Sequence, residues 1–207
     1  QLKEVDNPTP KDDDVLVKIH AASVNMYDWH LLTADIFLVR LTEGLLRPKH
    51  PIPGADIAGR VEAVGTNARQ FRPGDEVFGD LAACGNGGFA EYVSVPERFL
   101  APKPGNLTFE EAAAVPMAAV TALQGLRDLG QIRPGKKVLI QGASGGVGTF
   151  AVQIAKSFGA EVTAVCSTRN LDQAHSLGAD HVIDYTKEDF TKRGERHDLI
   201  LAANGYH

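Results

Sequence analysis

The chain has 207 residues and a formal net charge of -5 at pH 7, and 43% of its residues are hydrophobic and 23% charged. This composition is typical of a globular protein, and an acidic balance without a basic run excludes nucleic acid as an expected partner. Its two cysteines exclude a disulfide framework and favour a reducing compartment, which we take to be the cytoplasm. No apolar run is long enough to span a membrane, so no membrane partner is expected.

The first part of the chain predicts a mostly antiparallel β domain. Residues 15–19 alternate apolar and polar side chains, as expected of a half-buried strand. A turn signal containing proline and glycine, at residues 72–75, separates two later strands. Short strands divided by such turns favour a partly closed domain at residues 1–106. The predicted strands are residues 15–19, 54–65, 76–78 and 89–95.

Two stretches have the spacing of helices. Residues 31–47 are apolar at helical intervals and lack an internal proline, which predicts one or two short helices that end before Pro48. Further along, Thr108 precedes two glutamates and an alanine-rich run, a pattern typical of the start of a helix. We therefore expect a bridging helical segment at residues 107–135.

Residues 137–156 (KVLIQGASGGVGTFAVQIAK) predict the strand, turn and helix of a dinucleotide site. Ala143, Gly145 and Gly148 occupy the three small-residue positions that allow a tight turn, close approach of a pyrophosphate, and packing of helix on strand. Unpaired N–H groups at the start of the helix then face the phosphates. The alternative is a glycine turn that only joins strand to helix. The expected cofactor contacts in the turn are Ala143, Ser144, Gly145, Gly146, Val147 and Gly148.

From residue 136 onward, strands and helices alternate, which predicts a Rossmann-type parallel sheet with flanking helices. The predicted fold class is therefore α/β, with the antiparallel domain first. A complete sheet of this type has about six strands, and only four are predicted here, so we expect the domain at residues 136–207 to be incomplete at its C-terminus. Later strands are predicted at residues 161–166, 181–184 and 198–203, and helices at 171–177 and near Lys187.

The residues after the second strand of this sheet predict which dinucleotide binds. An NAD site places an acidic residue there, about 20 residues past the glycines, to accept from the ribose 2′-OH. This chain has Ser167, Thr168 and Arg169 instead. A cation and two hydroxyls suit a 2′-phosphate, so the expected cofactor is NADP(H). The alternative is that Arg169 is a solvated loop residue.

Several stretches, in the same order along nearly the whole chain, closely resemble the medium-chain dehydrogenase/reductase superfamily and its zinc-free quinone oxidoreductase and enone reductase branch. They are NMYDW, GADIAGRVEAVG, RPGDEVFG, GGFAEYV, EEAAAVPMAAVTALQGL and GASGGVGTFAVQIAK. The resemblance implies a GroES-like first domain and NADPH-dependent reduction of quinones or α,β-unsaturated carbonyls. It also implies a homodimer for a full-length chain. A protein that binds NADPH without catalysis, as a sensor or interaction partner, is the alternative.

The zinc enzymes of this superfamily begin their central motif with Gly-His-Glu, whereas here Ala55 and Asp56 follow Gly54. By resemblance, the position of the first thiolate ligand is at or near Asn25. Zinc at a catalytic site needs about three protein ligands, and the remaining histidines supply no matching set. We therefore expect no metal.

Without a metal, hydride transfer to an enone requires hydrogen-bond donors where charge grows on the carbonyl oxygen. By resemblance, Asn25 and Asp28 form the NxxD element of the active-site floor. We predict Asn25, Tyr27 and His30 as catalytic residues. The alternatives are that Asp28 caps the following helix and that His30, where relatives often have tyrosine, is a packed or exposed helix residue.

The resemblance adds two cofactor contacts, Thr121 and Tyr185, and the sheet topology adds two more. Thr121 would bind the carboxamide end of the nicotinamide, although a helical threonine also bonds back to a carbonyl. Tyr185 would lie beside the adenosine phosphate. Asn204 and Gly205 follow the fourth strand at its carboxyl end, where such sheets bind ligands. Cys84 lies in a glycine-rich loop, and we expect it to be structural.

Overall fold

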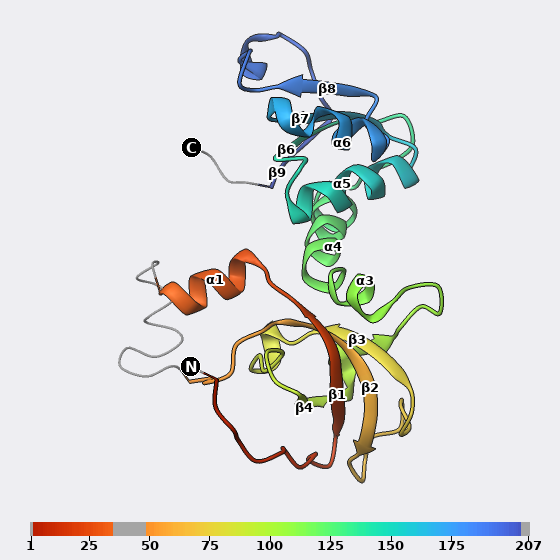
Figure 1. The fold of residues 1–207 in the computed structure, drawn as a ribbon. Coiled ribbons are helices and arrows are strands. Elements are labelled where there is room, and N and C mark those ends of the chain that lie inside the picture. The colour runs from red at the N-terminus through yellow and green to blue at the C-terminus, as the bar shows by residue number, and fades with distance from the viewer. Residues whose placement is uncertain (1, 35–48, 204–207) are drawn as a thin grey trace. The chain divides into compact units, whose positions relative to one another are not determined.

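The computed structural model describes residues 2–34 and 49–203, and the chain divides into two compact units, Gln1–Met117 and Ala118–His207. The first unit holds an antiparallel sheet and the second a parallel one (Figure 1). The predicted α/β class, with an antiparallel domain followed by a Rossmann-type sheet, is confirmed. The predicted helices at residues 31–47 lie mostly outside the described residues, as do Asn204 and Gly205.

Five strands form the sheet of the first unit, in the order β4-β1-β2-β3-β5 with every neighbouring pair antiparallel. Its core is apolar, and Val15, Val17, Ile57 and Val77 are fully buried. The alternation in β1 thus places every second side chain inward, as predicted. The strands are β1 (Asp14–Ser23), β2 (Asp56–Val64), β3 (Glu76–Asp80), β4 (Tyr92–Pro96) and β5 (Leu100–Pro102).

Strand β1 is longer than predicted, because it resumes pairing with β2 after an irregularity between Ile19 and Ala21. Its last residue, Ser23, pairs with Asp56 at the start of β2. A short helix, α1 (Met26–Thr33), follows directly. Among the described residues of this unit there are also two 3₁₀ helices, at Ala82–Cys84 and Glu97–Phe99, and α3 (Phe109–Ala113), which Thr108 caps as predicted.

In the second unit, four parallel strands lie in the order β8-β7-β6-β9. The strands are β6 (Lys137–Gln141), β7 (Glu161–Cys166), β8 (His181–Asp184) and β9 (Leu199–Ala202). The helices are α4 (Pro116–Leu123), which begins in the first unit, a π-helix at Gln124–Leu129, α5 (Gly146–Ser157) and α6 (Leu171–Ser176), with 3₁₀ helices at Thr168–Asn170 and Phe190–Lys192.

The predicted helix near Lys187 is wrong, since only the 3₁₀ turn at Phe190–Lys192 forms there. Two aspartates compete for the backbone in this segment. Asp184 accepts from the N–H of Thr186 and Asp189 from that of Thr191, at 3.0 Å in both cases. Such local bonds give the backbone an alternative to helical hydrogen bonds.

Helices α5 and α6 pack on one face of the parallel sheet, where alanines and β-branched side chains of β6 and β7 form the core (Figure 1). The opposite face carries a smaller cluster, Leu139, Val165 and Ile183, packed against Phe190. All four strands end at the same edge because they are parallel. The glycine turn, residues 167–170 and Tyr185 follow three of these strand ends, so the sheet topology gathers them there.

Candidate functional site

The glycine turn that follows β6 is held against the neighbouring strand. The backbone N–H groups of Gly142 and Ala143 both donate to the carbonyl oxygen of Val165, at 3.1 Å. Gly142 has a φ of +75°, which favours glycine. A Cβ added at Gly148 would lie 2.1 Å from the carbonyl oxygen of Gly142, so this third small position requires glycine. The close packing of helix on strand that the fingerprint predicts is therefore present in the structure.

Helix α5 begins at Gly146 with Gly145 as its N-cap, and within the described residues no side chain caps it. Gly145 and Gly146 are both exposed. The first N–H groups of the helix are thus available to an anion, and the helix dipole adds positive potential there. This edge can hold a pyrophosphate.

Side chains beyond the turn lie where the adenosine end of a dinucleotide would be expected. The Asn170 amide group donates to the hydroxyl oxygen of Ser144 at 2.9 Å and to that of Ser167 at 3.2 Å. This contact joins the glycine turn to the end of β7. Our sequence interpretation missed Asn170, although it directly follows the residues assigned to the phosphate site.

Thr168 does not offer its hydroxyl to a ligand in the way the sequence interpretation assumed. It donates to Asp184 at 2.5 Å, and Thr186 donates to the same carboxylate at 2.6 Å. These bonds, together with Lys187 at 3.5 Å, lower the pKa of Asp184 to about 2. Asp184 is therefore buried and charged, and its hydrogen bonds hold this loop in place.

Arg169 and Tyr185 are exposed at the same edge. Arg169 makes no ion pair with any residue in the described ranges, so its guanidinium is available to an anion. Tyr185 is 57% exposed, and its backbone N–H donates to the carbonyl oxygen of Cys166 at 3.1 Å, which fixes it next to the end of β7. Both side chains are therefore exposed at the carboxyl edge of the sheet, where Ser167 also lies.

Thr121 is exposed on α4, and no hydrogen bond from its hydroxyl to another described residue is found. One helical turn before it, Ala118 lies 3.8 Å from the position that a Cβ on Gly146 would take. Ala118 of α4 therefore lies beside the start of α5. Directly after β9, the N–H of Ala203 donates to the carbonyl oxygen of Gln141. This bond places the chain just before Asn204 beside the end of β6.

In the first unit, the predicted catalytic residue Asn25 belongs to a partly buried polar cluster. Its amide group donates to the carboxylate of Asp56 at 3.1 Å and to the hydroxyl of Ser23 at 3.4 Å. Its backbone N–H donates to Asp28 at 2.8 Å, and Asp28 also accepts from the N–H of Ala55 at 3.1 Å. Asp28 thus caps α1 and ties this helix to the chain before β2.

Asp56 is fully buried, and it accepts from the Ser23 hydroxyl at 3.3 Å and from the backbone N–H of Met117 at 3.1 Å as well as from Asn25. Burial raises its pKa to about 6, with a smaller contribution from Asp80, while the bonds from Asn25, Met117 and Ser23 act in the opposite direction. Sequence comparison with Gly-His-Glu pointed to this position only as a departure from the zinc motif.

Tyr27 accepts a hydrogen bond from a buried amide, that of Asn86. The side chain of Asn86 donates to its phenol oxygen at 3.4 Å, and Asn86 is only 7% exposed with a φ of +61°. The side-chain oxygen Oδ1 of Asn86 is buried without a hydrogen-bond partner among the described residues. His30 is half-buried in the same helix as Tyr27. Two of the three predicted catalytic residues are therefore fixed by amides or carboxylates that the sequence did not reveal.

Cys84 shows no sign of a reactive thiolate. Its thiol donates to the carbonyl oxygen of Leu81 at 3.4 Å, and burial raises its pKa to about 11. Within residues 2–34 and 49–203, no group of three or more histidine, cysteine, aspartate or glutamate side chains is arranged to hold a metal ion. The position of the zinc histidine is Ala55, whose side chain has no ligand atom.

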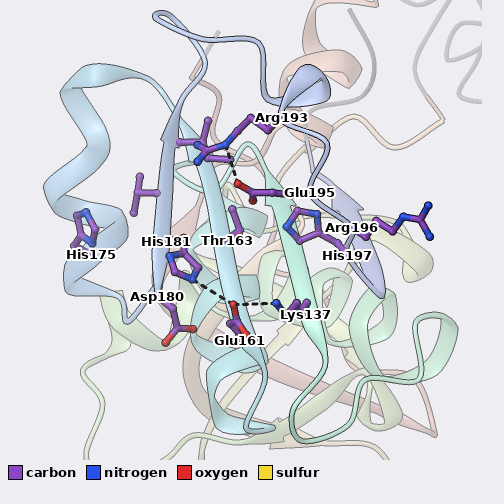
Figure 2. Close-up of a pocket in the computed structure, with 12 residues that line it drawn as sticks. Lys137, Glu161, Thr163, His175, Asp180, His181, Arg193, Glu195, Arg196 and His197 are labelled. Carbon is purple, nitrogen blue, oxygen red and sulfur yellow. Dashed lines mark hydrogen bonds and ion pairs between the residues drawn. The ribbon is translucent and has the colours of Figure 1, made fainter.

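A separate hollow of about 580 Å³ lies on the second unit (Figure 2), and no residue of the glycine turn lines it. Its floor includes Lys137, Glu161 and His181, the first residues of three strands, so it opens at the amino edge of the sheet. Figure 2 shows Glu161 between His181 and Lys137, at 3.3 and 3.9 Å. The charged residues that line this hollow are largely paired. The hollow is distinct from the carboxyl edge of the sheet, where the glycine turn lies.

An antiparallel unit followed by a parallel sheet with a glycine turn at its carboxyl edge defines the fold of a dinucleotide-binding dehydrogenase. Comparison of the sequence with protein families agrees. Residues 11–105 match the alcohol dehydrogenase GroES-like domain, and residues 146–200 match the zinc-binding dehydrogenase family. The chain belongs to the medium-chain dehydrogenase/reductase superfamily, in its quinone oxidoreductase branch.

Two curated relatives illustrate the branch. The chloroplast envelope quinone oxidoreductase homolog of Arabidopsis thaliana is 39% identical over 98% of this chain and 63% of its own length. The 2-methylene-furan-3-one reductase of Solanum lycopersicum is 41% identical over 96% of this chain and 51% of its own length. The chain thus spans between about half and two thirds of such relatives. Those named for a compartment are chloroplastic or mitochondrial, so they do not support the predicted cytoplasmic location.

Solved structures show the same fold. An alcohol dehydrogenase superfamily protein from Novosphingobium aromaticivorans is 36% identical with a TM-score of 0.83, over 97% of this chain and 61% of that one. The Escherichia coli quinone oxidoreductase complexed with NADPH is 27% identical with a TM-score of 0.79, over 92% of this chain and 56% of that one. A nicotinamide cofactor is therefore supported. No helix in the described parts of the chain is long and apolar enough to cross a membrane.

Proposed function

We propose that this chain belongs to a zinc-independent, NADPH-dependent reductase of quinones or α,β-unsaturated carbonyls. The observation that carries the proposal is the glycine turn, where Gly148 is required by packing and the start of α5 presents free N–H groups at the carboxyl edge of the sheet. The substrate class is supported by relatives named as quinone oxidoreductases and as an NADPH-dependent alkenal/one oxidoreductase.

The described residues fit a dinucleotide. The first turn of α5 would bind the pyrophosphate, Thr121 the carboxamide end, and Ser144, Ser167 and Arg169 the adenosine phosphate. When bound, NADPH supplies the hydride that reduces the substrate double bond or quinone. The protein supplies position and exclusion of water, and it stabilises the charge that develops on the substrate oxygen.

Tyr27 is the candidate donor to that oxygen, and the Asn86 amide holds its phenol group. For Asn25 the hydrogen bonds support a different role from the predicted one, because its N–H₂ group is directed at Asp56 and Ser23. We therefore assign Asn25 and Asp56 to shaping the floor of the site. His30 stays a candidate proton donor one turn further along α1.

Zinc independence rests on the chemistry of the residues at the motif. Ala55 offers no ligand atom, and the carboxylate of Asp56 already accepts from three groups, Ser23, Asn25 and Met117. A metal at this place would have to displace those bonds. We therefore expect a chelator to leave turnover unchanged.

Consumption of NADPH with a panel of quinones and enones tests the proposal, with NADH as the parallel cofactor and a chelator in a second series. We expect saturable turnover that the chelator does not reduce. Saturable binding of NADPH without turnover of any acceptor would contradict the reductase and support the binding-only alternative. Loss of turnover on chelation, restored by zinc, would contradict metal independence alone.

A further inference from the structure

Asn170 occupies an unusual position for an asparagine that precedes a helix. It is the N-cap residue of α6, where asparagine normally accepts a hydrogen bond from the first turn. Within the described residues its side chain makes no such cap bond. The amide is turned to Ser144 and Ser167 instead. The side chain therefore contacts residues at the carboxyl edge of the sheet, where the glycine turn lies, and does not cap its own helix.

The direction of these two hydrogen bonds decides what the serines can do. An asparagine amide has two hydrogens, and here one points at each serine oxygen, at 2.9 and 3.2 Å. A serine hydroxyl that accepts in this way keeps its own hydrogen for another acceptor. No other described residue takes the hydroxyl hydrogen of Ser144 or Ser167. Asn170 thus leaves two donors side by side, one from the glycine turn and one from the end of β7.

The surrounding charges suit a phosphate dianion despite the nearby aspartate. The carboxylate of Asp184 is occupied by the hydroxyls of Thr168 and Thr186 and lies 3.5 Å from the ammonium of Lys187. Its charge is therefore compensated within the loop. Arg169, two residues after Ser167 in the chain, is exposed and makes no ion pair with any described residue, so its positive charge is available to an anion.

We propose that Asn170 is the positioning residue that makes Ser144 and Ser167 donors to the 2′-phosphate of NADPH, and so sets the preference for NADPH over NADH. The inference rests on the proposed function and deepens it, because it assigns selectivity between cofactors to an amide that need not touch the phosphate. Hydrogen bonds to a charged group are stronger than neutral ones, so two oriented donors discriminate strongly between a phosphate and a hydroxyl.

The substitution Asn170→Asp tests this directly, since it keeps the shape of the side chain and replaces its donors by acceptors. A carboxylate at this place would draw both serine hydrogens toward itself and away from the ligand. The matched control is Gln173→Glu, which makes the same change from amide to carboxylate on an exposed position of α6. The control adds the same charge without altering the serines.

The probes are 2′,5′-ADP and 5′-AMP, which differ only in the 2′-phosphate, titrated by calorimetry into the 207-residue chain. We expect the native chain and the Gln173→Glu variant to prefer 2′,5′-ADP, and Asn170→Asp to lose at least about 30-fold of that preference. Affinity for 5′-AMP should change little. An unchanged preference in Asn170→Asp would overturn the inference.

The double variant Ser144→Ala, Ser167→Ala covers the case in which Asn170→Asp folds poorly, as judged by circular dichroism. It should lose the same preference, and adding Asn170→Asp to it should then have only the effect of Gln173→Glu. Retained preference without the two hydroxyls would refute the role of the serines. Turnover of a quinone with NADH does not need the 2′-phosphate, so it separates a failure of this inference from a failure of the reductase proposal.

Discussion

The buried carboxylate of Asp56 should make the stability of the first unit depend on pH. Its pKa is raised from 3.8 to about 6, chiefly because burial penalises the charged form. A pKa difference of one corresponds to about 1.4 kcal/mol, so this group alone accounts for about 3 kcal/mol of stability. The folded state binds the proton more tightly than the unfolded one. This stability is therefore fully present below about pH 4 and is lost as the pH rises through about 6.

The substitution Asp56→Asn removes the titration while keeping the shape of the side chain. Urea unfolding of both proteins, followed by the fluorescence of Trp29, reports on the first unit because Trp29 is the only tryptophan and lies on α1. The free energy of unfolding of the native chain minus that of the variant should fall by about 3 kcal/mol between about pH 4 and pH 7. Other titrating groups are common to both proteins and cancel.

The control is Asp13→Asn, an exposed carboxylate of the same unit, whose difference from the native chain should stay nearly constant over the same range. A difference for Asp56→Asn that is equally flat would refute the reasoning. It would mean that the pKa of Asp56 is the same in the folded and the unfolded chain, because the bonds from Asn25, Ser23 and Met117 offset the cost of burial.

Three further predictions concern the proposed site. Gly148→Ala should destabilise the chain by about 1–3 kcal/mol and weaken NADPH binding, because its Cβ would overlap backbone atoms; Gly105→Ala, with nothing within 4 Å, should be nearly neutral in the same thermal melts. Arg169→Ala should weaken NADPH binding about 10-fold and leave NADH binding unchanged, whereas the control Arg196→Ala should change neither affinity. Equal losses of affinity for both cofactors in Arg169→Ala would contradict the phosphate contact. Tyr27→Phe should lower kcat for an enone at least about 10-fold with an unchanged Kd for NADPH, and an unchanged kcat would exclude Tyr27 as the donor.

The surroundings of Asn25 show how a residue can be selected from a sequence while its hydrogen-bond partners are not. The motif NMYDW identified Asn25, and donation to the substrate oxygen was the natural expectation. In the structure, its amide hydrogens are directed at Ser23 and at Asp56, which lies 31 residues further along the chain. An amide that stabilises a buried carboxylate cannot also donate the same hydrogens to a substrate. Of the three predicted residues, Tyr27 and His30 therefore stay as the candidate donors.

The residues predicted to contact the adenosine phosphate also differ from one another in the structure. Ser167, Thr168 and Arg169 were assigned together because they are adjacent in sequence. The structure separates them, since the hydroxyl of Thr168 is taken by Asp184 while that of Ser167 accepts from Asn170. Neighbouring residues in a loop point in different directions, and sequence adjacency alone does not say which of them face a ligand.

The sequence by itself determined the local elements, namely the alternating strand β1, the Thr108 cap and the strand, glycine turn and helix of the dinucleotide edge. These depend on interactions within a few residues, which spacing and residue type reveal. Only the tertiary structure decided the partners of Asp56, the raised pKa of that group, and the bridge from Asn170 to Ser144 across 26 residues. Burial and hydrogen-bond direction depend on which distant segments pack together, and that is set by the strand order and register of each sheet.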